Sequence, residues 1–313
     1  MQQADNMDKI EHKYLDVRGL KLHVAEIGTG PAVIFIHGFP EIWYSWRHQM
    51  IAVADAGFRA LAPDCRGYGL SEKPAEAEKT TFRDLLDDLV VILDLLGLPK
   101  VFLVAKDFGV RPAYHLAMIH PDRVSAVITV GVPFILNVVP FGIPKGFHMN
   151  RWREPGRAEK DFGRFDVKTV IRKIYILFIE SELQVARQDQ EILDLVDASA
   201  PLPSWFSEED LTNYATLYEK SGFQTPLQVP YRAWLEDYGL DELKVRTPAL
   251  LIMGEKDYVL KFGPLAEYIS SGMVKEFVPD LEVSYVPEGT HFVQEQFPEQ
   301  VNPILLNFLR KHT

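Results

Sequence analysis

The sequence has little that would mark a secreted or membrane-bound protein. Its 313 residues include one cysteine, Cys65, so no disulfide can form within the chain. No apolar run reaches the length that spans a bilayer. The opening stretch MQQADNMDKI is polar, and no Asn-x-Ser/Thr acceptor site occurs. From these absences we expect a cytoplasmic protein.

The sequence also has fewer basic than acidic residues. Lys and Arg total 33 against 44 Asp and Glu, which gives a formal net charge of −11, and the acids are spread along the chain. Such a chain is not drawn to nucleic acid or to anionic membranes, so we expect neither as a partner. The 47% hydrophobic content suffices for one large core or a core with an insert. A monomer and a homodimer both remain open.

Short apolar runs alternate with helical patterns along the chain. HKYLDVRGLKLHVAEIG predicts an antiparallel hairpin around Arg18-Gly19. TFRDLLDDLVVILDLLG has apolar residues at helical spacing, with Thr81 and Asp84 at its start. The alternation predicts an α/β fold with a mostly parallel sheet flanked by helices. The runs typical of buried parallel strands are residues 33–37, 58–62, 101–105, 125–131, 248–254 and 283–286.

The alternation stops between about 132 and 242. This region reads as helical, is rich in aromatic residues and arginine, and is interrupted by prolines. We interpret residues 134–240 as a helical cap inserted into a core made of residues 1–133 and 241–313. The cap should lie over the carboxyl ends of the strands, where open α/β sheets bind ligands.

VFLVAKDFGVRPAYHLA, residues 101–117, has the strand–turn–helix layout of a nucleophile elbow. The usual pattern is Gly-x-Ser-x-Gly, but here Asp107 stands at the apex. Asp257 in GEKD and His291 in PEGTHF each follow a later predicted strand. The order nucleophile, acid, histidine is that of the α/β-hydrolases, so we predict an α/β-hydrolase fold with these three residues as a catalytic triad.

HGFP, residues 37–40, follows the first predicted parallel strand. A turn here can aim the backbone N–H of Phe39 into the site, and the N–H of Phe108 provides a second donor. Together they form the predicted oxyanion hole. His37, at the start of the turn, is a further candidate for substrate binding or proton donation.

An aspartate at the apex changes the chemistry. A carboxylate with an unperturbed pKa near ~3.9 is already ionised at neutral pH. It suits attack on an sp³ carbon with a strained or good leaving group, which gives an alkyl ester of Asp107. His291, held by Asp257, would then activate water to cleave that ester. The elbow therefore favours epoxides or alkyl halides, and this chemistry requires neither a metal nor an organic cofactor.

Several motifs together resemble the soluble epoxide hydrolases, most closely the plant type, over nearly the whole chain. They are HGFPEIWYSWRHQM, APDCRGYGLSEKP, the Asp elbow, LPSWFSEEDL, VPYRA and EGTHFVQEQFPEQV. The resemblance implies two cap tyrosines that donate hydrogen bonds to the epoxide oxygen, and a glutamate that positions the hydrolytic water. Tyr231 of VPYRA matches one tyrosine, and Glu41 matches the glutamate. The aromatic cap indicates an apolar epoxide as substrate.

The chain departs from this family at two points. Counting back from Pro155 in RWREPG, the position of the second cap tyrosine holds His148. As an imidazolium His148 would donate from both ring nitrogens, whereas burial would push it to the neutral form. The elbow reads Lys-Asp-Phe-Gly at 106–109, where the family usually has His-Asp-Trp-Gly. Lys106 either helps to keep Asp107 ionised or is a solvent-facing or structural side chain.

Two alternatives remain open. Fluoroacetate dehalogenases use the same nucleophile, a His and a Tyr from the cap near the fluoride, and an Arg four residues after the nucleophile. His148, Tyr231 and Arg111 could fill those roles, although Phe108 stands where that family usually has a second Arg. Some α/β-hydrolase folds instead serve as ligand receptors, and the intact predicted triad argues against that reading.

Overall fold

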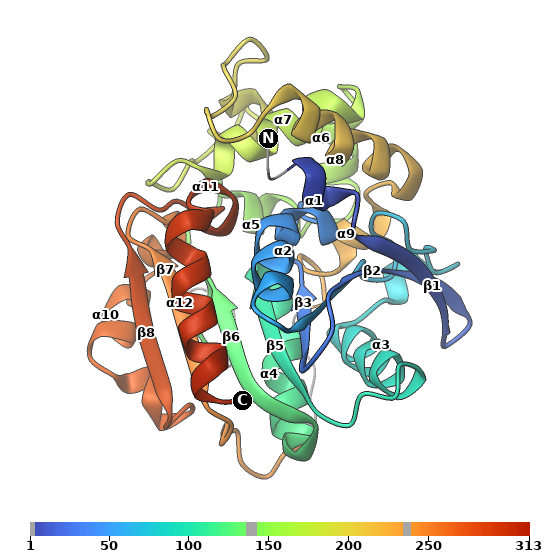
Figure 1. Cartoon of the computed structure of the whole chain (residues 1–313). Helices are drawn as coiled ribbons and strands as arrows, with labels where there is room; N and C mark the ends of the chain where they lie inside the picture. Colours follow the sequence, from blue (N-terminus) through green and yellow to red (C-terminus); the bar gives the residue numbers. More distant parts are fainter. Residues whose placement is uncertain (1–3, 136–142, 234–238) are drawn as a thin grey trace.

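The computed structural model describes residues 4–135, 143–233 and 239–313 (Figure 1). Within these ranges eight strands form one sheet in the order β1-β2-β4-β3-β5-β6-β7-β8. The six strands from β3 to β8 run parallel, and β2 is antiparallel to both β1 and β4. The strands are β1 (Glu11–Val17), β2 (Leu20–Ile27), β3 (Ala32–Ile36), β4 (Arg59–Pro63), β5 (Val101–Lys106), β6 (Val124–Val130), β7 (Ala249–Gly254) and β8 (Leu281–Val286).

Helices cover both faces of the sheet, which is the α/β-hydrolase arrangement that the sequence predicts. On one face, Met50 of α2 and Phe308 of α12 join a core cluster with strand residues. On the other, Leu86 of α3, Ala113 of α4 and Leu265 of α10 belong to the larger cluster. The helices outside the segment between β6 and β7 are α1 (Ala4–Met7), α2 (Arg47–Asp55), α3 (Phe82–Leu95), α4 (Val110–Ile119), α10 (Leu265–Ser270), α11 (Val293–Gln296) and α12 (Pro298–Lys311).

Local sequence signals account for the element ends. The turn between β1 and β2 has positive φ at both central residues, 50° at Arg18 and 84° at Gly19, as the tightest hairpin turns require. Thr81 caps α3 in a capping box with Asp84, and Gly97 beyond its end has a φ of 63°. The predicted hairpin and this predicted helix are confirmed.

The segment between β6 and β7 is helical, and Figure 1 shows it across one end of the sheet. A buried polar network joins it to the rest of the chain. Arg47 pairs with Glu295 at 2.7 Å and with Asp210 of α8 at 3.0 Å, and the Tyr175 hydroxyl of α7 donates to Glu295 at 3.1 Å. The division into a core and a cap at 133/134 and 240/241 stays a prediction. We call these helices the cap helices: α5 (His148–Arg151), α6 (Arg157–Phe162), α7 (Val167–Phe178), α8 (Glu208–Ser221) and α9 (Gln224–Gln228).

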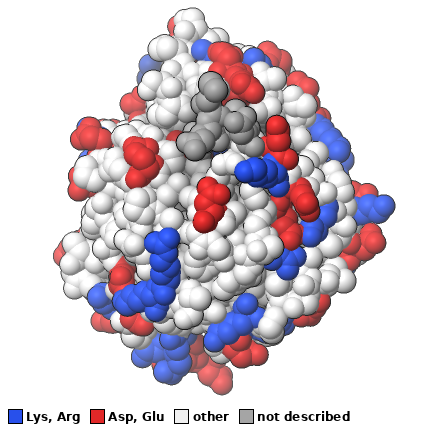
Figure 2. Space-filling model, viewed as in Figure 1, with Lys and Arg blue, Asp and Glu red and all other residues white. Residues whose placement is uncertain are grey.

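In the part of the chain that the structure describes, neither the charge on the face in Figure 2 nor the helices indicate binding to nucleic acid or insertion into a membrane. Figure 2 shows acidic and basic side chains interspersed over one face of the molecule, with no large area of one sign. Among the described residues, every helix is too short or too polar to cross a bilayer.

Candidate active site

The turn after β5 has the geometry of a nucleophile elbow. Asp107 opens a 3-10 turn that leads into α4, and its φ of 52° lies in the left-handed region that non-glycine residues avoid. The turn packs closely on HGFP. A Cβ on Gly38 would lie 2.4 Å from Asp107 Cβ, and one on Gly109 would lie 2.5 Å from the His37 carbonyl oxygen. Glycine at both positions allows this approach, which brings Asp107 to the backbone of Phe39.

The structure brings together the three predicted triad residues. His291, which follows β8, places Nδ1 3.1 and 3.2 Å from the two carboxylate oxygens of Asp257, which follows β7. His291 Nε2 lies 3.5 Å from Asp107 Oδ2. All three side chains are buried. The histidine ring thus stands between two carboxylates, and the Asp257 carboxylate also accepts a hydrogen bond from the N–H of Val259 at 3.0 Å.

The pKa of Asp107 is lowered although the residue is buried. Burial disfavours its charged form, but the hydrogen bond and charge of His291, the charge of Lys106 and the backbone N–H of Phe39 outweigh it. That N–H donates to Asp107 Oδ1 at 3.0 Å. Asp107 is therefore ionised at neutral pH, with Oδ1 held by the backbone and Oδ2 on the side of His291.

The pKa of His291 is raised. Burial and the nearby Lys106 charge oppose protonation, but Asp257 and Asp107 together outweigh them. Because one of the two raising carboxylates is the predicted nucleophile, the pKa of His291 depends on the chemical state of Asp107.

Lys106, at the end of β5, is fully buried. Its ammonium lies 5.8 Å from the centre of the Phe292 ring and has no hydrogen-bond partner among the described residues. Gly131 makes the room, because a Cβ there would lie 3.1 Å both from Lys106 Nζ and from Asp257 Oδ2. Lys106 is therefore a buried cation beside the triad rather than a solvent-facing side chain.

Glu41, which follows HGFP, is buried close to the triad. Its Oε1 accepts a hydrogen bond from Gln294 Nε2 at 2.6 Å, and Oε2 has no partner among the described residues. Burial raises its pKa to about 7, with the charge of Lys106 acting in the opposite direction. Glu41 is thus poised to change its protonation state near neutral pH. Gln294 was not predicted, and its position three residues after His291 was the available signal.

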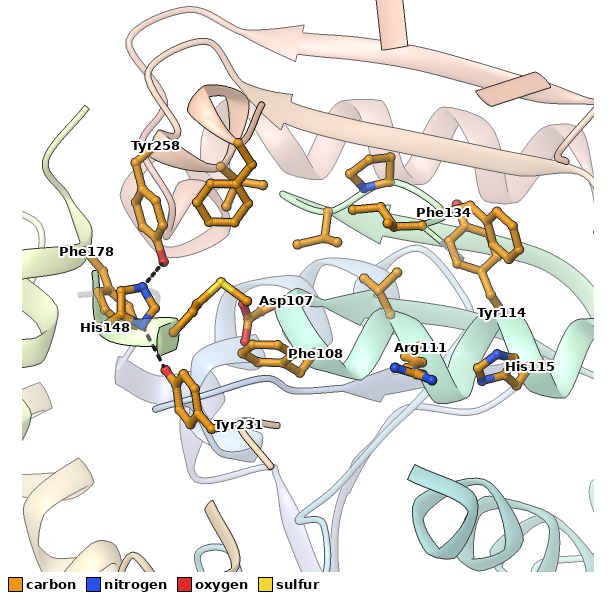
Figure 3. A pocket seen from close by; sticks show the side chains of 17 residues that line it. Asp107, Phe108, Arg111, Tyr114, His115, Phe134, His148, Phe178, Tyr231 and Tyr258 are labelled. Atoms are coloured by element: carbon orange, nitrogen blue, oxygen red, sulfur yellow. Dashed lines mark hydrogen bonds between the residues drawn. The ribbon is translucent and has the colours of Figure 1, made fainter. Parts of the chain in front are cut away.

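Asp107 faces a cavity with a volume of about 750 Å³, part of it open to solvent. Its other walls are mostly apolar and aromatic, and they come from α4, the loop after β6, the cap helices and the turn after β7 (Figure 3). The residues that line it are Asp107, Phe108, Val110, Arg111, Tyr114, His115, Val132, Pro133, Phe134, Ile135, His148, Met149, Phe178, Tyr231, Tyr258, Val259 and Phe262.

His148 and Tyr231 lie together in this cavity, as Figure 3 shows. The Tyr231 hydroxyl is 3.4 Å from His148 Nδ1. Burial lowers the pKa of His148 to about 3, against the opposing charge of Asp107. The ring is therefore neutral at neutral pH, so the imidazolium considered from the sequence does not form there. Tyr258, which was not predicted, lies on the other side of the same ring, and its place directly after Asp257 was the signal.

Of the other candidate site residues, His37 lies outside the cavity lining, and Phe108 and Arg111 belong to it. Both nitrogens of His37 are engaged by backbone: Nε2 accepts from the N–H of Cys65 at 3.0 Å, so Nδ1–H donates to the carbonyl of Gly38 at 2.9 Å. His37 thereby holds the turn and does not line the cavity. Phe108 and Arg111 do line it, with the Arg111 guanidinium 4.7 Å from the centre of the Phe82 ring. The backbone-donor role of Phe108 stays a prediction.

A helix-flanked, mostly parallel sheet with an aspartate elbow, an acid and a histidine at its strand ends defines an α/β-hydrolase. The family model for the alpha/beta hydrolase fold matches residues 31–298. Epoxide hydrolase 2 of Siraitia grosvenorii is 35% identical over 97% of this chain and 100% of its own length.

Solved structures agree with these matches. Potato (Solanum tuberosum) epoxide hydrolase I superposes with a TM-score of 0.89 at 35% identity, covering 97% of this chain and 100% of its own. An epoxide hydrolase from Vigna radiata gives 0.89 at 36% identity, covering 97% and 99%. The chain belongs to the alpha/beta hydrolase fold family, in the branch of the epoxide hydrolases.

Proposed function

We propose that this enzyme opens apolar epoxides to vicinal diols through a covalent ester on Asp107, which water then hydrolyses. The observation that carries the proposal is the position of Asp107. Its Oδ1 accepts the N–H of Phe39, its Oδ2 lies 3.5 Å from His291 Nε2, and the residue lines an otherwise mostly apolar cavity. The names of the full-length relatives support epoxides as the substrate class.

The first step is attack by Asp107. Oδ2, the oxygen that the Phe39 N–H does not hold, displaces the epoxide oxygen from one ring carbon, and the new oxyanion is protonated by a donor in the cavity. Tyr231 is the predicted donor. Its pKa is raised well above the usual value, chiefly by burial, so its hydroxyl keeps its proton throughout the working range.

The second step is hydrolysis of the ester. Once Asp107 is esterified it carries no charge, so one of the groups that raise the pKa of His291 is lost. His291 then becomes neutral more readily and accepts a proton from the attacking water. The charge that develops on the carbonyl oxygen falls on Oδ1, the atom already held by Phe39. Alkylation therefore prepares the base for the step that follows it.

Glu41 is the predicted partner of that water. Its Oε2, which has no partner among the described residues, and the Gln294 amide are buried beside the triad, where a carboxylate can orient a water molecule. Because its pKa is about 7, the ionised fraction of Glu41, and with it the hydrolysis rate, should rise through neutral pH.

The substrate class follows from the cavity walls, which carry aromatic and aliphatic side chains around a few polar groups. Arg111 also lines the cavity. Its guanidinium could bind the carboxylate of a substrate such as fluoroacetate, so the dehalogenase alternative is included in the test below. We further propose a cytoplasmic location, since Cys65 is the only cysteine and the chain has no Asn-x-Ser/Thr site.

A side-by-side turnover screen tests the proposal. Purified enzyme is incubated with apolar epoxides, fluoroacetate and simple esters, with Asp107→Ala as the inactive control. We expect diol from the epoxides and no product from the other two. Fluoride release without diol formation would establish the dehalogenase, and binding of epoxides without turnover would establish a receptor.

A further inference from the structure

The segment of residues 291–296 has two sides. It forms a turn that is closed by a hydrogen bond from the N–H of Glu295 to the carbonyl of Phe292 at 3.0 Å, and the turn continues as α11. Side chains three residues apart lie on the same side of such a turn. His291 and Gln294 bind carboxylates of the candidate active site. Phe292 and Glu295 instead contact the cap helices.

The Glu295 carboxylate is buried and held at both oxygens. Oε1 accepts from the Tyr175 hydroxyl of α7 at 3.1 Å, and Oε2 accepts from Arg47 of α2 at 2.7 Å. The Tyr214 hydroxyl of α8 lies 3.2 and 3.3 Å from the two oxygens. The Tyr175 ring also stacks on Phe292, with 4.3 Å between the ring centres. Two cap helices and α2 therefore fix this side of the segment.

The other side of the segment carries the groups that hydrolysis needs. Gln294 Nε2 donates to Glu41 Oε1 at 2.6 Å, which sets the orientation of that carboxylate. Glu41 Oε2, Gln294 Oε1 and His291 Nε2 are all buried and have no hydrogen-bond partner among the described residues. They are the polar atoms available to a water molecule beside the ester. Their relative positions depend on how the segment is held.

We propose that Glu295 is a positioning residue for ester hydrolysis, because its contacts with the cap helices and Arg47 fix the turn from which Gln294 orients Glu41. The inference rests on the proposed function, and it gives the cap helices a part in the second step of the reaction. Glu295 is not among the residues that line the cavity, so it does not touch the substrate. Attack by Asp107 should therefore not depend on it.

Glu295→Gln is the first test, in an enzyme that the screen has shown to open epoxides. The variant keeps the size of the side chain but loses the charge that binds Arg47. Ester formation and ester decay are timed separately by rapid quench and intact-protein mass spectrometry. Because a small displacement of a positioned group can cost up to ~10²-fold, we expect ester decay to slow about tenfold at pH 8, while ester formation keeps the wild-type rate.

A double variant, Tyr175→Phe with Tyr214→Phe, gives an independent test. It removes both hydroxyls from Glu295 but leaves the aromatic rings and the ion pair with Arg47 in place. Since a typical hydrogen bond contributes a factor of up to about ten, we expect ester decay to slow roughly fivefold and ester formation to stay unchanged.

The pH profile of ester decay separates anchoring from charge. The charge of Glu295 raises the pKa of Glu41, and the charged groups that act on Glu41 are Lys106, Glu295, Asp107 and His291. In Glu295→Gln the rise of ester decay should move to lower pH, because Glu41 then ionises more readily. The double tyrosine variant keeps the charge and should keep the wild-type profile. An unshifted profile in Glu295→Gln would overturn the link between Glu295 and Glu41.

Asp161→Asn is the matched control. Asp161 of α6 is also a buried carboxylate that accepts from an arginine, Arg164, and from the N–H of Leu193 at 3.1 Å, but it lies outside the cavity lining. Both steps should keep their wild-type rates in this variant. Equal slowing of the two steps in Glu295→Gln would overturn the proposal, and so would wild-type ester decay in both test variants. Continued diol formation would leave the epoxide hydrolase assignment intact.

Discussion

The two sides of the cavity differ in charge. The side built from the strand ends presents Asp107, and the other charged or titratable groups, His291, Asp257, Glu41 and Lys106, are buried around it. We call these five residues the floor. The opposite side presents His148, Phe178 and Tyr231, which we call the roof, and none of them carries a charge at neutral pH.

The difference separates the two tasks of the proposed reaction. The floor holds an ionised nucleophile, Asp107, together with groups whose protonation changes near neutral pH, as the proposed hydrolysis requires. The roof holds neutral donors and acceptors, which can receive an oxygen at any ordinary pH. Tyr258 joins the two sides, because it follows Asp257 in the chain and its hydroxyl contacts His148. The comparison therefore predicts that floor variants alter the pH profile and that roof variants alter the rate alone.

Glu41→Gln should have the largest effect among the floor residues that support the triad. With the carboxylate gone, ester hydrolysis should slow on the order of 10²-fold, the lower end for loss of a positioned acid–base group, while alkylation proceeds. The accumulated ester, measured by mass spectrometry under multiple turnover, checks this. Equal slowing of both steps would contradict the role. Glu219→Gln is the control, because Glu219 is an exposed residue of α8.

The same variant should be more stable than wild type at high pH. The folded-state pKa of Glu41 is about 7 against 4.5 in the unfolded chain, so the folded state binds the proton more tightly and stability falls as pH rises through this window. Glutamine removes the penalty, which amounts to about 3 kcal/mol at pH 8 and under about 1 kcal/mol at pH 5. Denaturant unfolding at the two pH values measures the difference.

Lys106→Met should have a smaller effect on rate and shift the pH profile. The Lys106 charge lowers the pKa of both Glu41 and His291, so without it hydrolysis should need a higher pH. A rise of one unit in the pKa of Glu41 would reduce its ionised fraction at pH 7 about fivefold. Because a buried ammonium without a partner is costly, the variant should also unfold at a higher temperature.

Lys100→Met provides the control for Lys106, since Lys100 is exposed just before β5. It should change neither the profile nor the unfolding temperature. An unshifted profile in Lys106→Met would show that Lys106 serves packing alone.

The fold was predictable because its signals are local. Apolar runs locate all six parallel strands to within two residues at each end, and the Thr81–Asp84 capping box marks the start of α3. The candidate triad could also be predicted from the sequence. Chain order and strand ends together place Asp107, Asp257 and His291 at the carboxyl ends of parallel strands of the sheet.

The side chains around the triad were harder to predict, because their roles arise from packing between distant segments. Lys106 at a strand end could be a solvent-facing side chain, and only the folded structure shows that it is fully buried, next to Gly131. In the sequence, Tyr258 is one aromatic residue after a predicted strand. Its hydroxyl contacts His148, which is 110 residues away in sequence, and this contact arises only in the folded chain. His37 reads as a site residue because of its motif, although its nitrogens serve the turn.

Trapping the ester tests the central claim most directly. In His291→Gln, Asp107 keeps its place at the elbow but the proposed base for hydrolysis is gone, so the proposed ester should form and persist. Mass spectrometry of this variant mixed with an epoxide that wild type turns over should show one added substrate mass on the peptide that contains Asp107. A variant that stays unmodified at every time point, while wild type makes diol, would mean that water attacks the epoxide directly and that Asp107 is not the nucleophile.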